Sequence, residues 1–322
     1  GGLLAQYLER KAELLGVERL RFWEVDAPVG KLSRTVEFDE AAELIVDRFS
    51  SLSPEMGAFA RRAFEEAWIE AEDRAQKRAG GFCTWLPESG QSRVFLTFDR
   101  SINRAETIAH ELGHAFHHQA FNGVPYLCSD YPMALAETAS TLAEQLLTDA
   151  FLSAASSDDE RLLLLDAQAQ RVVTFFMNIR ARFLFELDFY REREQGIVPA
   201  ERLNELMTEA QKRAYRGCLG AYHPLFWASK LHFYLTGAPF YNFPYTFGFL
   251  FSQGIYEWAL SEPKAFQNRY VELLRDTGVM PVAELARKHF GADVAGPDFW
   301  RRAVERAVAP VKAFLAQTAS AR

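Results

Sequence analysis

The chain has 322 residues, of which 49% are hydrophobic and 25% charged, and its net charge is -7. This composition is ordinary for a soluble globular protein, allows one large domain or two subdomains, and excludes disorder as the default. The negative charge argues against a nucleic-acid partner, because phosphate binding needs clustered Lys and Arg. No apolar run is long enough to span a bilayer, so we expect no membrane partner either.

The first predicted elements are helical. Apolar residues at helical spacing indicate a helix over 3–15, stopped by Gly16, and Asp39 caps a second helix that runs to residue 49. Between these helices, residues 20–25 have the composition of a short extended run. Ser53 followed by Pro54 is typical of a helix start, and the helical pattern continues to about residue 79.

The next segment has a β-like rather than a helical pattern. Residues 80–87 and 92–98 are two β-like runs around a polar turn, which predicts a hairpin. Asn103, with Glu106 three residues later, resembles a capping box for a helix that ends near Ala120. Further helices are predicted over 132–153, 157–194 (capped by Ser157), 199–216, 224–234, 243–260, 263–276, 281–290 and 297–318. We expect an all-α fold with one small β-hairpin, forming a single domain over 1–322.

The strongest chemical signal is the motif His110-Glu111-Leu112-Gly113-His114. Residues four apart lie one turn above another on a helix, so His110 and His114 can both reach one Zn²⁺ at roughly 2.0–2.1 Å. Glu111 lies about 100° round the helix, where it can hold a metal-bound water rather than ligate. The pattern predicts one zinc ion per chain and Glu111 as the base; the alternative is a surface helix with incidental histidines.

Zinc needs a third protein ligand. A metzincin would require Gly at 117 and His at 120, but the chain has His117 and Ala120. The next helix offers Glu137 and Glu144, which are two turns apart and share one face. Small neighbours allow close approach at Glu137, so we predict Glu137 as the ligand and Glu144 as the acceptor that orients a ligand imidazole. Asp130 is a weaker competitor for the ligand role. His117 either supports this site or is a core residue.

These motifs resemble, in order, the oligoendopeptidase F branch of the thimet oligopeptidase family. The matching stretches are Gly81-Phe82-Cys83-Thr84, Ser92 to Phe95, HELGHAFHH, AETAST with Glu144, His232-Phe233-Tyr234, Pro239-Phe240-Tyr241, and Tyr245. Nearly the whole chain participates. The resemblance implies a mainly helical, zincin-like peptidase acting on short peptides. It corresponds to the C-terminal catalytic half of longer members, either as a fragment or as a shortened member.

The resemblance also implies roles for His232, Tyr241 and Tyr245, which would supply a second donor to the oxyanion and position the substrate. By spacing alone, the two tyrosines are four residues apart and would equally fit one helix face packed in the core.

The hairpin has a predicted role as well. An edge strand near the metal can pair with an extended peptide, and Gly80 and Gly81 would let that backbone come close. We therefore expect Gly80, Gly81, Phe82 and Cys83 to bind the substrate backbone; the alternative is an ordinary surface hairpin.

The cysteines bear on the compartment. Cys83, Cys128 and Cys218 are scattered and odd in number, which is neither a disulfide framework nor a cysteine-type zinc knuckle. No secretory signal is visible, although the chain starts without Met, which leaves a removed signal open. We expect a cytoplasmic location.

The function that these observations predict is a zinc-dependent endopeptidase that hydrolyses internal bonds of short oligopeptides. Two alternatives stay open: a non-catalytic peptide-binding fragment with a structural zinc, and a helical metallocarboxypeptidase. Side-chain preference, the physiological substrate and the oligomeric state are beyond the sequence.

Overall fold

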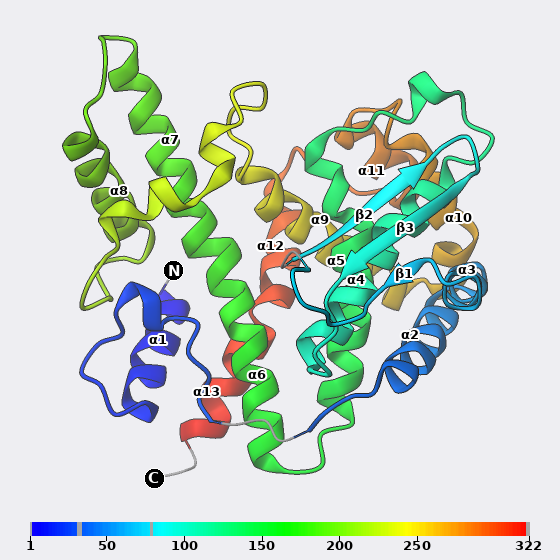
Figure 1. The fold of residues 1–322 in the computed structure, drawn as a ribbon, viewed down its shortest axis with the longest axis horizontal. Coiled ribbons are helices and arrows are strands. Elements are labelled where there is room, and N and C mark those ends of the chain that lie inside the picture. Colours follow the sequence, from blue (N-terminus) through cyan, green and yellow to red (C-terminus); the bar gives the residue numbers. More distant parts are fainter. Residues whose placement is uncertain (1, 31–33, 78–79, 320–322) are drawn as a thin grey trace. The chain divides into compact units, whose positions relative to one another are not determined.

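The computed structural model describes residues 2–30, 34–77 and 80–319. Contacts divide the chain into two compact units. The first unit comprises Gly1–Leu32, Ala155–Phe247 and Ala307–Arg322, and the second comprises Ser33–Ala154 and Gly248–Arg306. The fold is mainly helical with one small sheet, as predicted (Figure 1). Every helix in the described part of the chain is too short or too polar to cross a bilayer.

Two helices form the centre of the second unit. Helix α4 (Ile102–Ala120) buries Ile108, Leu112 and Phe116, and packs along α5 (Met133–Ser153). A Cβ atom at Gly113 would lie 2.6 Å from both the Ala139 carbonyl oxygen and the Ser140 Cα. Only glycine therefore allows the two helix backbones to approach this closely.

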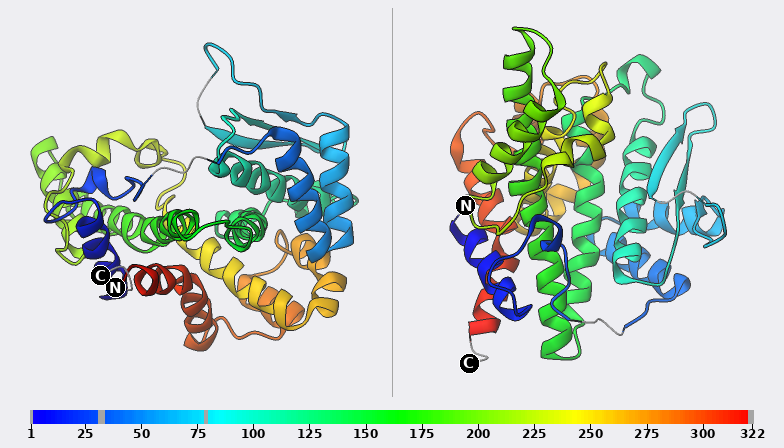
Figure 2. Two further views of the ribbon diagram at one scale, coloured as in Figure 1. Left: turned by 90° about the horizontal axis from the view of Figure 1, so that it is seen from below. Right: turned by 60° about the vertical axis from the view of Figure 1, so that its left-hand side comes forward.

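The predicted hairpin is confirmed. Strand β2 (Gly81–Leu86) pairs antiparallel with β3 (Gln91–Leu96), and both lie along α4, as Figure 2 shows from further directions. A third strand, β1 (Ile69–Glu70), pairs in parallel with β3, giving the order β1-β3-β2. Strand β2 is consequently an edge of the described sheet.

The prediction that the helix starting at Pro54 reaches residue 79 is wrong, because β1 lies within that range. Ser53 caps α3 (Pro54–Glu65) as expected, accepting from the Met56 N–H, but the helix ends at Glu65. Ala67 then takes a left-handed conformation (φ 54°), and Trp68 is buried against Phe59 at a ring distance of 5.8 Å. Burial of this indole overrides the helical propensity of the segment and leads the chain into β1. Residues 78–79 lie outside the described residues.

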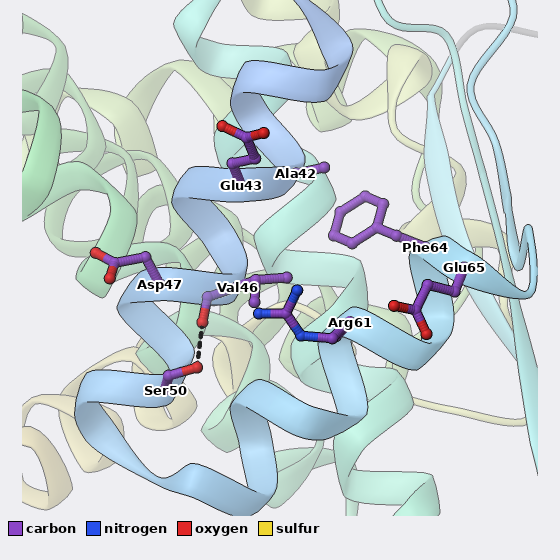
Figure 3. Close-up of a pocket in the computed structure, with 8 residues that line it drawn as sticks. All are labelled: Ala42, Glu43, Val46, Asp47, Ser50, Arg61, Phe64 and Glu65. Atoms are coloured by element: carbon purple, nitrogen blue, oxygen red, sulfur yellow. Dashed lines mark hydrogen bonds between the residues drawn. The ribbon is translucent and has the colours of Figure 1, made fainter.

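Helices α2 (Phe38–Leu52) and α3 pack against each other around an open groove of about 380 Å³ (Figure 3). Close packing beside the groove relies on Gly57, where a Cβ would lie 2.0 Å from the Ser50 hydroxyl oxygen. None of the predicted site residues lines this groove, whose walls are Ala42, Glu43, Val46, Asp47, Ser50, Arg61, Phe64 and Glu65. The second unit continues through α10 (Pro263–Asp276), α11 (Val282–Phe290) and α12 (Pro297–Ala307).

The first unit contains a long helical rod. It consists of α6 (Asp158–Val173), a π-helical turn (Thr174–Asn178) and α7 (Ile179–Arg193), which follow one another without a break. Helices α1 (Gly2–Leu14) and α13 (Ala309–Ala319) pack together, α13 packs on α6, and α8 (Ala200–Ala214) packs on α7. The Asp166 carboxylate anchors α1 by accepting hydrogen bonds from Tyr7 and Lys11, and all three side chains are buried. Helix α9 (Phe243–Ser261) belongs to both units.

Of the other predicted caps, two are wrong and one is confirmed. Helix α4 is capped by Ser101, whose hydroxyl accepts from the Arg104 N–H, rather than by Asn103. Helix α2 begins after Glu37, so Asp39 lies within its first turn. Ser157 caps α6 as predicted, accepting from the Glu160 N–H.

Three further segments differ from their predictions. Residues 20–25 form a single turn (Phe22–Glu24) with an isolated bridge from Arg21 to Ala221, and Phe22 is buried against Phe226. Residues 224–234 form two 3-10 turns, Pro224–Ser229 and Leu231–Tyr234, instead of an α-helix. The helix predicted over 297–318 is divided into α12 and α13, because Pro310 cannot donate a backbone hydrogen bond to the preceding turn.

Candidate metal site and catalytic residues

The second unit brings the predicted ligand set together. Helix α4 presents His110 and His114, whose rings meet edge-to-face at 4.9 Å, and α5 presents Glu137. The Glu137 Oε2 atom lies 3.4 Å from His110 Nε2 and 3.7 Å from His114 Nε2. One ligand atom from each of the three residues lies within 4.8 Å of the others.

These separations fit a zinc ion. In a tetrahedral site with bonds of about 2.0–2.1 Å, ligand atoms are roughly 3.4 Å apart, and two imidazoles with one carboxylate are a common donor set for catalytic zinc. The three side chains are half-buried. The residues present therefore fit the metal that the motif predicts.

Two features hold Glu137 in place. The Ser140 hydroxyl donates to Glu137 Oε2 at 2.9 Å, so the carboxylate is fixed from its own helix. Helix α9 passes close by at Gly248, where a Cβ would lie only 2.7 Å from the Glu137 Cβ. The small neighbours of Glu137 indicated close packing in the sequence, but the contributions of Ser140 and Gly248 depend on tertiary contacts that the sequence does not reveal.

Glu144 lies beside His110, the first of the three candidate ligands. Its Oε2 atom accepts from His110 Nδ1 at 3.0 Å. With Nδ1 used in this way, the Nε2 atom of His110 is the one that faces Glu137. This arrangement fixes the ring orientation of His110, in the way that carboxylates commonly orient histidines that bind zinc.

The electrostatics of the cluster favour a cation. Burial lowers the pKa of His110, but hydrogen bonds and charge from Glu137 and Glu144 outweigh it and raise the pKa to about 10. Burial raises the pKa of Glu137, but the His110 hydrogen bond and the charges of both histidines bring it down to about 2. Burial and the neighbouring His110 charge lower the pKa of His114 to about 4. The two carboxylates thus stabilise positive charge between the imidazoles, whether a proton or a metal ion supplies it.

Glu111 is 6% exposed and lies on α4 beside the start of the edge strand. Burial, followed by the negative charges of Glu137 and Glu144, raises its pKa to about 7, although the His110 charge acts the other way. A Cβ at Gly81 would lie 3.2 Å from Glu111 Oε1, so β2 passes directly next to this carboxylate. A carboxylate with a pKa near neutrality suits a general base that later acts as an acid.

The hairpin residues lie at this end of β2. Gly80 has a φ of 111°, a conformation that favours glycine, and no atom lies within 4 Å of a Cβ built there. Phe82 is 52% exposed and stacks on Phe95 across the sheet at 5.0 Å. Cys83 lies 3.8 Å from His118 Nδ1, and burial raises the pKa of its thiol to about 12. All three cysteines of the chain are free, as expected.

His117 is fully buried one turn beyond His114 on α4. Its Nε2 atom donates to the Thr277 hydroxyl at 2.8 Å, because that hydroxyl itself donates to the Leu274 carbonyl. Its ring stacks on Tyr131 at 4.4 Å, and burial lowers its pKa to about 3. These contacts favour the core interpretation of His117 over a role beside the metal ligands.

The first unit contains a second cluster of predicted residues. His232, from the turn Leu231–Tyr234, stacks on Tyr241 at a ring distance of 4.8 Å and lies 5.8 Å from the Tyr245 ring. The two tyrosine rings are 6.1 Å apart. The fold therefore gathers these three side chains. Two residues that sequence reasoning missed, Arg182 and Asn242, lie directly behind His232.

The fold is mainly helical, and two histidines from one helix lie beside a glutamate from the next. Residues 3–306 match Peptidase family M3, and the chain belongs to this family. The resemblance inferred from the motifs is thereby confirmed.

The chain is 27% identical over 314 residues to an oligoendopeptidase F homolog of Lactococcus lactis subsp. lactis, covering 94% of this chain and 50% of that protein. It is 24% identical over 302 residues to the group B oligopeptidase PepB of Streptococcus agalactiae, covering 92% of this chain and 49% of that protein. The chain thus spans about half the length of the curated relatives it matches.

Solved structures show the same fold. A putative peptidase from Chlamydophila abortus superposes with a TM-score of 0.81 at 24% identity, covering 98% of this chain and 53% of that one. PZ peptidase A with inhibitor 2 superposes with a TM-score of 0.76 at 20% identity, covering 97% of this chain and 56% of that one.

Proposed function

We propose that the chain is a zinc-dependent endopeptidase that hydrolyses internal bonds of short oligopeptides, with residues 1–322 acting as one catalytic domain. The observation that carries this proposal is the convergence of His110, His114 and Glu137 ligand atoms, with Glu111 beside them at an edge strand. Membership of Peptidase family M3 supports the same reaction class.

His110, His114 and Glu137 would hold one zinc ion per chain. When bound, the ion polarises the scissile carbonyl and makes water a better nucleophile near neutral pH. Glu144 keeps the His110 ring oriented through the hydrogen bond to Nδ1, and Ser140 keeps the Glu137 carboxylate in place. The protein thus supplies a rigid donor set before substrate arrives.

Glu111 performs the proton transfers. Its carboxylate accepts a proton as water attacks the peptide carbonyl, and delivers that proton to the leaving nitrogen as the C–N bond breaks. Burial of the Glu111 side chain raises its pKa, which favours uptake of the proton from the attacking water.

Strand β2 would bind the substrate backbone. An extended peptide can add to the edge of a sheet through main-chain hydrogen bonds, which tolerate different side chains. Gly80 and Gly81 leave space for that approach, and Phe82 and Cys83 continue the strand. From the family resemblance, His232, Tyr241 and Tyr245 would position the peptide and supply a donor to the oxyanion.

The test is hydrolysis of a quenched fluorescent peptide by the zinc-loaded chain, with and without a chelator. Glu111→Gln should keep about one zinc per chain and lose turnover by roughly 10²–10⁴-fold. Glu88→Gln, in the exposed turn between β2 and β3, is the matched control and should keep full activity. Unchanged turnover in Glu111→Gln would refute the base assignment.

Product masses separate the alternatives. Internal fragments support an endopeptidase, whereas release of C-terminal residues alone supports a carboxypeptidase. Zinc-dependent peptide binding without any cleavage supports the non-catalytic binding fragment. The cytoplasmic location stays an expectation that rests on the scattered, free cysteines.

A further inference from the structure

The His232 ring is held by a buried amide. Asn242 is fully buried, and its Oδ1 atom lies 2.9 Å from His232 Nδ1. The same oxygen accepts a hydrogen bond from Arg182 Nη1 at 3.0 Å. One amide oxygen therefore joins the guanidinium of α7 to the imidazole of the turn Leu231–Tyr234.

The orientation of the Asn242 amide follows from the chemistry of its neighbours. A guanidinium group has donors and no acceptor, so the amide atom that faces Arg182 must be the oxygen. The Arg182 side chain is itself fixed, because its Nε donates to Asn178 Oδ1 at 2.8 Å. On the other side, the Glu186 carboxylate accepts from the Phe240 N–H at 3.1 Å and lies near Asn242, whose amide N–H group is complementary to it.

This orientation determines the tautomer of His232. Because Asn242 Oδ1 only accepts, the His232 Nδ1 atom must carry a hydrogen. A neutral imidazole with hydrogen on Nδ1 has a lone pair on Nε2. In the neutral state, Nε2 can accept a hydrogen bond but cannot donate one to an oxyanion. Among the residues that the structure describes, Nε2 has no hydrogen bond, and the side chain is half-buried.

We propose that Arg182 and Asn242 hold neutral His232 as the Nδ1–H tautomer, so that its Nε2 accepts a hydrogen bond from a backbone N–H of the peptide substrate. This assignment rests on the proposed function. Arg182 and Asn242 act as positioning residues, since they reach the substrate only through His232.

The tautomer is measured directly by nuclear magnetic resonance. Long-range proton–nitrogen correlations of the zinc-loaded chain, labelled with ¹⁵N at histidine, are recorded about two units above the ordinary histidine pKa of about 6.5. The His232 signals are those lost in His232→Gln. A proton on Nδ1 is the expected result, and a proton on Nε2 overturns the proposal. Asn242→Leu should abolish the preference, and if that variant does not fold, the wild-type spectrum still decides.

The contact with substrate is tested by pairing peptide and protein changes. In a series of peptides, each backbone N–H is replaced in turn by N-methyl, and kcat/KM is measured. The wild-type chain should lose roughly three- to tenfold at one position, the usual worth of a neutral hydrogen bond. His232→Ala should have a lower kcat/KM for the parent peptide and lose no more at the N-methyl position that affects the wild-type chain. His223→Ala is the matched control and should keep the wild-type pattern of losses.

The outcomes separate this inference from the proposed function. Equal losses in the wild-type and His232→Ala chains would overturn the contact with the peptide N–H while leaving peptidase activity intact. Failure of the wild-type chain to cleave the parent peptide would overturn the proposed function and the substrate contact together. The tautomer of His232 is decided by the spectrum in either case.

Discussion

Replacing Gly113 by alanine should separate the two helices that build the proposed metal site. The added Cβ would lie 2.6 Å from the Ala139 carbonyl oxygen and from the Ser140 Cα, both of which are backbone atoms that cannot rotate away. To reach an ordinary contact of 3.4 Å, α4 and α5 must move apart by about 0.8 Å. Zinc–ligand distances tolerate about 0.2 Å, so Glu137 can no longer meet both imidazoles at bonding distance.

The expected result is a coupled loss of metal affinity and stability. Zinc affinity, measured by competition with a chelator, should fall by at least ten- to hundredfold. The free energy of unfolding should fall by about 1–3 kcal/mol, since overpacking costs about that much, and Tm should drop by several degrees. Gly237→Ala is the matched control, because a Cβ there meets no atom within 4 Å. Wild-type zinc affinity and Tm in Gly113→Ala would refute the reasoning.

Three other variants test separate parts of the structure. Gly81→Val should fill the space beside Glu111, lowering kcat/KM while zinc content stays unchanged; equal activity would contradict peptide binding at β2. In the zinc-free chain, Glu111→Gln should raise the free energy of unfolding by about 3 kcal/mol at pH 8. This gain should vanish below about pH 4, because a carboxyl with a folded pKa of about 7 destabilises the fold only at pH values where it ionises in the unfolded chain. Denaturant titrations at both pH values test this, and an equal gain at both would contradict the prediction. Lys11→Met should lower the free energy of unfolding by about 3–5 kcal/mol, because the buried Asp166 carboxylate loses its ion-pair partner. Adding Asp166→Leu should recover most of that loss in the same assay.

The clustering of the candidate metal ligands could be predicted because its signals are local. His110 and His114 are one helical turn apart in the sequence, and the following helix offered Glu137 and Glu144 on one face. Helix periodicity alone therefore restricts where these side chains point. The hairpin was visible for the same reason, since both strands and their turn are contiguous in the chain.

The remaining features depend on contacts between distant segments. The third strand β1 follows from burial of Trp68, which competes against a sequence of good helix formers. The close approach at Gly113 depends on which residue of α5 lies opposite it. The Asn242 amide contacts both Arg182, 60 residues away, and His232, and no rule of sequence spacing predicts such a contact. Pattern analysis finds residues that share an element, whereas these pairings arise only after the elements pack.

The π-helical turn at Thr174–Asn178 has a consequence for how this chain can tolerate change in length. An extra residue in a helix rotates everything beyond it by about 100°, so the face that α7 presents is set by this insertion. Asn178, within the turn, holds Arg182, and the Phe175 carbonyl accepts from the Thr246 hydroxyl on α9. Deleting one residue here would give a regular α-helix, but it would rotate the Arg182 guanidinium away from the Asn242 amide. Homologous chains that keep this imidazole in the same tautomer should therefore conserve the spacing of the rod, not merely its helicity.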